Sequence, residues 1–372
     1  MQRKPITSDA GPPAGADGTP VRTGKALPRG TQAFVRRRLP RLLGESDFPR
    51  VDLPEFGKKS TVAILTFRSG RRVVLRGFGD PAKSLRYTSA MDYCRGKTLP
   101  VPSLLATDTG WRTRLRFGQG FCIEEFIEGA VYAHTDRTPA QAEAVVRAVA
   151  SIHSETAPYW GPIRRGSMQI RNPRSYREYL RKHVGRLIRD IAKQGGLSAD
   201  PVAAGEPAAV GDGQNGERAP LASFVSLAEL EGWGRWFEER IHAMEEPGAF
   251  NLAHHHLAAD DVMIAPDNAT ATLLDNGSLQ FGNFVQDVED ALAFLAPHAP
   301  EWRARLLTLY MERQTHLPAD ADYDAASEVF RAERHLKRLR RSARRRSVKP
   351  QDKEDAVFQN VEALRAVIDG TA

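Results

Sequence analysis

Residues 250–292 constrain the fold of this chain more than any other part of the sequence. Two short β-rich segments, 262–264 and 271–274, flank the Pro-Asp-Asn turn at 265–268, and this pattern predicts a β-hairpin. Polar residues stand at both outer ends of the hairpin, in the run 254–261 before it and at Asp275 after it. We expect these groups to meet on one side of the hairpin. Converging acids at such a place suit a divalent cation that carries phosphates.

The same stretch resembles the catalytic segment of the aminoglycoside phosphotransferase family, small-molecule kinases with a protein-kinase-like fold. The family order is His-Gly-Asp-Leu-His-Pro-Gly-Asn-Val, a hairpin, Ile-Asp, and then Gly-x-x-x-x-Asp-Leu. The corresponding residues here are His254-His255-His256-Leu257-Ala258-Ala259-Asp260-Asp261-Val262, then Leu274-Asp275, then Gly282 and Asp287-Val288. His256 stands where the family has its catalytic Asp, and Asp261 stands where it has its metal-binding Asn.

The resemblance covers about residues 31–370 and implies an α+β fold with two lobes. A small N-lobe would hold an antiparallel β-sheet, and a larger C-lobe would be mostly helical and carry the catalytic hairpin. The expected parts are a tail at 1–30, the N-lobe at 31–125, and the C-lobe at 126–372 with its catalytic hairpin at 252–292 and an insertion at 195–222. The tail and the insertion are rich in Gly and Pro and contain few large apolar residues, so both are predicted to be disordered.

In the N-lobe, Ser-Gly between two β-rich runs predicts a hairpin over residues 61–77. The resemblance implies that this hairpin covers ATP, with the loop from Gly57 to Ser60 offering N–H groups to phosphates and Arg76 holding them. Glu125 falls at the hinge, where neighbouring backbone groups would pair with adenine. Kinases place a Glu on the following helix to orient the phosphate-binding cation, but residues 84–91 contain none.

In the C-lobe, the resemblance implies that Asp261 and Asp275 bind Mg²⁺, with a carboxylate replacing the usual amide at Asp261. His256 would orient the acceptor hydroxyl or act as its base, since a free imidazole has a pKa near 6.5. His254 takes a structural role. Asp287 either braces the catalytic loop or caps a helix, and both are compatible. A zinc site in the histidine run is not expected, because adjacent residues of an extended strand point to opposite faces.

The positive charge of the chain is concentrated near its C-terminus. The run Arg331–Lys349 holds ten cations and the single anion Glu333, a surplus of nine against a whole-chain net charge of +7. One interpretation is a solvated helix face with Val329, Phe330, Leu336 and Leu339 turned inward. Another is an anionic partner, such as a phosphate-rich molecule or nucleic acid, although the aromatic residues that stack on bases are missing. The sequence Arg334-His335-Leu336-Lys337 also resembles the C-terminal helices of kinases for cell-wall amino sugars.

The remaining features point to a reduced, cytoplasmic protein. Cys94 and Cys122 lie in apolar surroundings without metal-ligand spacing, and no apolar run approaches the length of a membrane helix. We therefore expect no membrane partner.

The leading hypothesis from the sequence is a diverged ATP- and Mg²⁺-dependent phosphotransferase acting on a hydroxyl of a sugar, an aminoglycoside or another natural product. Its rival is a pseudokinase that binds nucleotide or a protein without catalysis. This alternative rests on three replaced groups: the catalytic Asp, the helix Glu and the phosphate-binding Lys, at whose place Arg76 stands. A third interpretation is a nucleic-acid-associated protein that uses the basic helix.

Overall fold

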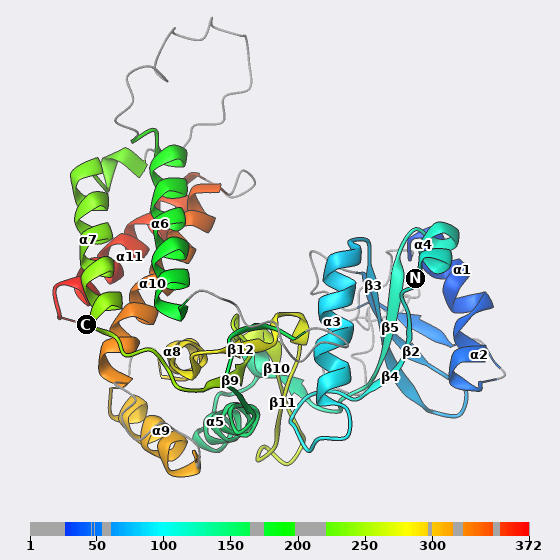
Figure 1. Ribbon diagram of the computed structural model, residues 1–372. Coiled ribbons are helices and arrows are strands. Elements are labelled where there is room, and N and C mark those ends of the chain that lie inside the picture. Colours follow the sequence, from blue (N-terminus) through cyan, green and yellow to red (C-terminus); the bar gives the residue numbers. More distant parts are fainter. Residues whose placement is uncertain are drawn as a thin grey trace, which may run out of the picture.

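The computed structural model describes residues 27–45, 47, 49–53, 61–163, 175–197, 221–296, 300–314, 323–344 and 350–371. An antiparallel sheet in the N-terminal part is followed by a mostly helical C-terminal part, and the two lie side by side (Figure 1). We call the part that ends with strand β5 the N-lobe and the rest the C-lobe. The predicted α+β class is confirmed.

A five-stranded antiparallel sheet forms the centre of the N-lobe, in the order β1-β2-β3-β5-β4. Its β2–β3 hairpin is the one predicted, with Thr66 opposite Arg72 across the Ser-Gly turn. Side chains alternate between buried and half-buried along both strands, as expected for a sheet with two different faces. The strands are β1 (Arg50–Asp52), β2 (Thr61–Thr66), β3 (Arg72–Phe78), β4 (Leu104–Asp108) and β5 (Gly120–Glu125).

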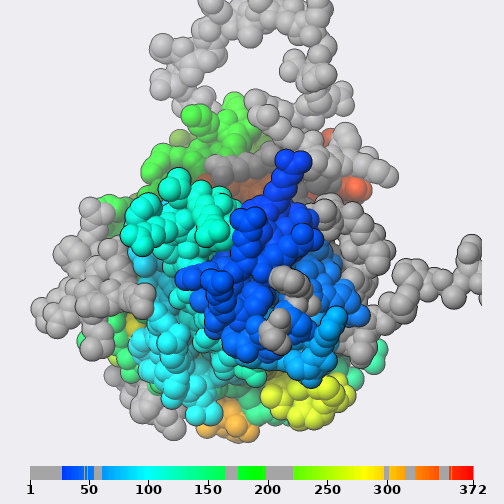
Figure 2. Space-filling view, turned by 90° about the vertical axis from the view of Figure 1, so that its right-hand side faces the viewer, coloured from blue at the N-terminus to red at the C-terminus, as the bar shows by residue number. Residues whose placement is uncertain are grey.

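Helices cover both faces of this sheet. On the outer face lie α1 (Arg29–Arg37), α2 (Leu39–Leu43) and α4 (Trp111–Phe117), and Phe34 stacks on Phe121 with 3.8 Å between ring centroids. Figure 2 shows α1, α2 and α4 together on this outer surface. On the inner face, towards the C-lobe, lies α3 (Pro81–Cys94), which packs Tyr87 and Met91 against Cys122.

The catalytic hairpin consists of β10 (Val262–Ile264) and β11 (Ala271–Leu273), and β6 (Ala130–Val131) adds a third strand. Gly129 is required beside it, because its φ is +144° and an added Cβ would lie 2.0 Å from the carbonyl oxygen of Ile264. Helix α5 (Pro139–His153) packs on this sheet. It begins with the predicted cap at Thr138, which forms a full capping box with Gln141.

A second small sheet precedes helix α8 (Phe284–Leu295), in the strand order β7-β9-β12-β8. These strands are β7 (Thr156–Ala157), β8 (Gly161–Pro162), β9 (Phe250–Ala253) and β12 (Gln280–Gly282). Strand β9 is buried along its whole length, and it leads directly into the histidine run.

The far end of the C-lobe is a group of long helices (Figure 1). It contains α6 (Tyr176–Gly195), α7 (Leu227–Ala243), α10 (Tyr323–Arg344) and α11 (Pro350–Ile368), with α9 (Pro300–Arg313) beside α5. Single-turn 3₁₀ helices η1 (Tyr132–His134), η3 (Leu221–Ser223), η4 (Ala259–Asp261) and η5 (Asn276–Ser278) complete the described elements. Among the described residues, no helix is both long and apolar enough to cross a membrane.

The basic run differs from a simple solvated face. Its apolar residues are buried as predicted, with Leu336 and Leu339 both at 0% exposure. Three of its cations, however, are engaged inside the lobe: Lys337 pairs with Glu333, Arg340 pairs with Asp190, and Arg334 donates to a carbonyl oxygen of α8. The described part of the run therefore stabilises the helical packing, and residues 345–349 lie outside it.

The other predicted helices occur close to their expected positions, whereas α4 was not anticipated. Arginines at 112, 114 and 116 alternate with uncharged residues in this helix, a pattern that resembles a strand more than an amphipathic helix. Trp111 and Leu115 remain 69% and 80% exposed. The tail at 1–30 and the insertion at 195–222 fall largely outside the described residues, so their predicted disorder stays a prediction.

Candidate active site

The loop after β9 is shaped by a buried carboxylate on α8. Asp287, at 0% exposure, accepts hydrogen bonds from the backbone N–H groups of His254 and His255, the latter at 2.7 Å. His153 lies 3.3 Å away through Nε2 and contacts Tyr310 at 2.7 Å through Nδ1. Burial would raise the pKa of Asp287, but these donors and the surrounding imidazoles hold it well below its usual range.

This bracing matters because the loop adopts an unfavourable backbone. His255 has a φ of +66°, in the left-handed region that glycine adopts readily and that the resembled family fills with Gly. The N-cap of α8 is Asn283, whose side chain accepts from Val285. Of the two roles considered for Asp287, the structure therefore places it at the loop, and the cap belongs to a different residue.

Asp261 and Asp275 flank the open end of the hairpin. Val262 pairs with Leu273, and the next N–H along, that of Leu274, donates to the carbonyl oxygen of Asp261 at 2.7 Å. Asp275 follows at once with a φ of +53° and a side chain that is 69% exposed. Burial raises the pKa of Asp261 to about 6, and the negative charge of Asp275 adds to this shift while His254 opposes it.

Arg76 extends from β3 towards these acids. Its Nε donates to Glu124 at 3.0 Å, and its Nη1 lies 3.7 Å from Asp275. The guanidinium also stands over the ring of Tyr87, which in turn donates its hydroxyl to Glu124. Burial alone would lower the pKa of Arg76, but Tyr87, Glu124 and Asp275 together raise it above its usual value. This cation is therefore permanently charged and fixed in position.

Glu124 is the residue that sequence reasoning missed. Residues 84–91 of α3 contain no acid that could orient Arg76, and the acid comes instead from the neighbouring strand. Arg76 pairs with Cys122 in the β3–β5 register, and Glu124 is two residues further along the same face. The sequence signal that could have found it is the acidic residue at the end of the otherwise uncharged run 120–124, and the structure buries Glu124 to 1% exposure.

The other predicted nucleotide-binding residues are placed only in part. Gly57 and Ser60 lie outside the described residues. Glu125 ends β5 at the expected hinge, and its N–H already donates to Ser103 at 2.9 Å. Adenine recognition at this edge would therefore fall to the backbone that follows Glu125.

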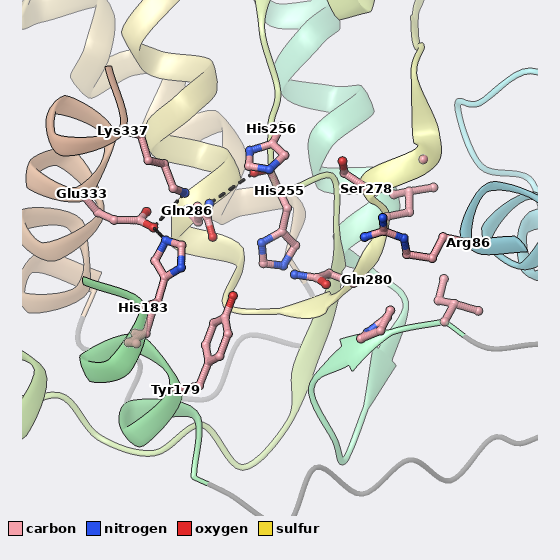
Figure 3. Close-up of a pocket in the computed structure, with 15 residues that line it drawn as sticks. Arg86, Tyr179, His183, His255, His256, Ser278, Gln280, Gln286, Glu333 and Lys337 are labelled. Carbon is pink, nitrogen blue, oxygen red and sulfur yellow. Dashed lines mark hydrogen bonds and ion pairs between the residues drawn. The ribbon is translucent and has the colours of Figure 1, made fainter. Parts of the chain in front are cut away.

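His256 opens into a cavity of about 250 Å³ beside the hairpin. Figure 3 shows Arg86 on one side of this cavity, Glu333 and Lys337 on the other, and His255 and His256 between them. His256 stays exposed at the cavity, yet desolvation by the surrounding protein, together with the positive charge of Lys337, lowers its pKa to about 4. The imidazole is therefore neutral at pH 7. The other lining residues are Pro162, Ile163, Tyr179, Leu180, His183, Gly277, Ser278, Leu279, Gln280 and Gln286.

His254 makes no contribution to this cavity. It is 1% exposed, and its Nε2 lies 2.7 Å from the carbonyl oxygen of Leu274, so it ties the loop to the end of the hairpin. No cluster of three or more His, Cys, Asp or Glu residues suited to a metal occurs within the described ranges. Two carboxylates with nearby phosphates are nevertheless a usual environment for Mg²⁺, which retains several waters and needs few protein ligands. Asp261 and Asp275 fit that requirement.

Solved structures that match this fold include aminoglycoside phosphotransferases and an ethanolamine kinase. No protein-family model and no curated protein matches the sequence. A putative aminoglycoside phosphotransferase from Ralstonia eutropha JMP134 is 16% identical, with 91% of this chain and 98% of that one covered and a TM-score of 0.58. Plasmodium vivax ethanolamine kinase is 11% identical, with coverage of 92% and 89% and a TM-score of 0.59.

A third match is a thermostable mutant of aminoglycoside phosphotransferase APH(4)-Ia, solved in a ternary complex with ADP and hygromycin B. It is 15% identical, covers 91% of this chain and 99% of that one, and has a TM-score of 0.55. The chain therefore has the protein-kinase-like fold of the aminoglycoside phosphotransferases and related small-molecule kinases. The resemblance noted at residues 250–292 is confirmed at the level of fold, whereas fold alone leaves the reaction open.

Proposed function

We propose that this protein is an ATP-dependent phosphotransferase that phosphorylates a hydroxyl group of a small molecule. The observation that carries the proposal is the placement of Arg76, which Glu124 fixes on one side and which reaches to 3.7 Å from Asp275 on the other. A cation on β3 and an acid after the hairpin are the two groups that hold nucleotide phosphates and their metal in kinases.

The roles of the other residues follow from this placement. Arg76 would bind the phosphates, and Asp261 and Asp275 would hold Mg²⁺, which neutralises phosphate charge during transfer. Complexes of APH(4)-Ia mutants with ADP and with AMP-PNP support nucleotide binding by a protein of this fold. His256 would accept a hydrogen bond from the acceptor hydroxyl.

The experiment is a thermal-shift titration with Mg·ATP, because a ligand that binds only the folded state raises the melting temperature. We expect Mg·ATP to stabilise the protein and Asp275→Asn to weaken its binding by about tenfold to a hundredfold. Asp275 is a suitable target because its side chain is exposed and its loss should leave the fold intact. Asp260→Asn is the matched control, an exposed acid next to Asp261. No stabilisation by Mg·ATP, or an equal loss in both variants, would contradict the proposal.

The second candidate function is a nucleotide-binding pseudokinase. It is favoured by His256 at the place of the catalytic Asp in the resembled family. The two candidates give the same result in nucleotide binding and different results in turnover. ATP consumption in the presence of small hydroxyl acceptors would identify an enzyme, and binding without turnover would support the pseudokinase.

A further inference from the structure

The cavity beside His256 has an unusual balance of charge for a site that accepts an aminoglycoside. Arg86 and Lys337 are cations, and Glu333 is the only acid among the described residues that line it. Glu333 is 3% exposed, and its Oε1 lies 2.8 Å from Lys337 and 2.9 Å from His183. An ammonium group entering the cavity would therefore find no free carboxylate.

Arg86 is the cation that remains available. It lies on α3 with an exposed side chain and has no hydrogen bond or ion pair with any other described residue. In Figure 3 its guanidinium points towards the cavity from the side of Ser278 and Gln280. Lys337, across the cavity, is already paired with Glu333. The excess positive charge of the cavity is therefore located on Arg86.

The deeper part of the cavity offers neutral polar groups. His255 is 7% exposed, lines the cavity, and its Nε2 has no partner among the described residues. Burial lowers the pKa of His255 to about 4, so its ring is uncharged. Gln280 and Gln286 add amide groups. The Nε2 of His255 is closed to the cavity and lies against Gly282, so the neutral polar side chains that a ligand can reach are those of His256 and Gln280.

We propose that the cavity binds an anionic acceptor, a small polyol with one carboxylate or phosphate group that pairs with Arg86 while its hydroxyls contact His256 and Gln280. The proposal rests on the proposed kinase function and narrows its acceptor class. At about 250 Å³ the cavity lies below the usual range for drug-sized ligands, which favours a single sugar ring over a multi-ring aminoglycoside. A guanidinium suits this task because it forms two parallel hydrogen bonds with a carboxylate or a phosphate.

The test uses hexoses of similar size that differ in charge: glucuronate and glucose 6-phosphate as anions, glucose as the neutral sugar and glucosamine as the cation. Binding is measured by calorimetry and thermal shift without nucleotide at constant ionic strength. We expect at least one anion to bind about fivefold or more tighter than glucose, and glucosamine to bind no tighter than glucose. A preference for glucuronate or for glucose 6-phosphate distinguishes the two acidic groups.

Arg86→Gln should abolish the preference for the anion, whereas Lys83→Gln, an exposed lysine one turn away on α3 and outside the cavity, should retain it. The proposal is overturned if no anion binds better than glucose, or if Arg86→Gln keeps the preference. Mg·ATP binding, measured in parallel, reports on the kinase function separately. A protein that binds Mg·ATP without selecting anions would retain the proposed function and lose only the acceptor class.

Discussion

The nucleotide side and the acceptor side of the candidate site depart from the kinase pattern in different ways. On the nucleotide side, Arg76 and Glu124 replace residues of the usual type and position but restore the same ion pair, at 3.0 Å. On the proposed acceptor side, a neutral His256 stands where the resembled family has an acidic Asp, and Arg86 adds a positive charge. The comparison teaches that the position of the acid, and not the element that carries it, fixes the cation on β3, whereas the substitution at His256 changes the charge of the cavity itself.

Asp287 braces the loop that carries His256, and the largest expected effect comes from removing its charge. Asp287→Asn keeps one acceptor but turns an amide towards the N–H groups of His254 and His255. We expect a loss of about 3 kcal/mol in the free energy of unfolding at pH 7, measured by denaturant titration.

The pH dependence checks the cause. Because the pKa of folded Asp287 is depressed, its contribution to stability is present above the unfolded pKa, near 3.9, and is lost as the pH falls further. The difference between wild type and Asp287→Asn should therefore shrink in acid. A constant difference across this range would show that the carboxylate charge is not what braces the loop.

The next prediction tests whether the acceptor side alone limits transfer. His256→Asp restores the carboxylate of the resembled family and should raise ATP consumption with the neutral sugar glucose by about tenfold, since general-base groups contribute at least this much. His256→Asn is the matched control, because it has the same shape without a basic oxygen pair. If Mg·ATP binds and neither variant changes the rate, the nucleotide side is also defective, and the contrast between the two sides fails.

The smallest expected effect sharpens the assignment of the metal site. The pKa of folded Asp261 is raised to about 6, above its unfolded value near 3.9. Protonated Asp261 thus favours the folded state, and this stability is present below pH 4 and lost as the pH rises through 6.

Asp261→Asn should consequently make the ion-free protein more stable at pH 8, by about 1–2 kcal/mol, with little change at pH 4. In the presence of Mg·ATP the order should reverse, because the metal stabilises only the ionised carboxylate. Melting temperatures with and without Mg·ATP at both pH values provide the measurement, and Asp260→Asn should follow wild type throughout. If Mg·ATP stabilises Asp261→Asn and the wild type to the same extent, Asp261 does not hold the metal.

The sequence by itself determined those features whose causes are local. The hairpin follows from a turn between two β-rich segments, and α5 begins at Thr138 because a capping box needs only residues three apart. The motif order of residues 254–288, through its resemblance to a known family, was likewise enough to predict the fold, and the roles that it implies for His256 and Asp275 stay predictions.

Only the tertiary structure decided which charged groups form ion pairs and which line the same cavity. Arg76 and Glu124 are 48 residues apart and meet through the β3–β5 register, which a change of one residue would reverse to the other face. Arg86, His256 and Lys337 come from three distant parts of the chain and meet at one cavity. Periodicity and spacing describe each segment alone, whereas the charge of a cavity is the sum over segments brought together by packing.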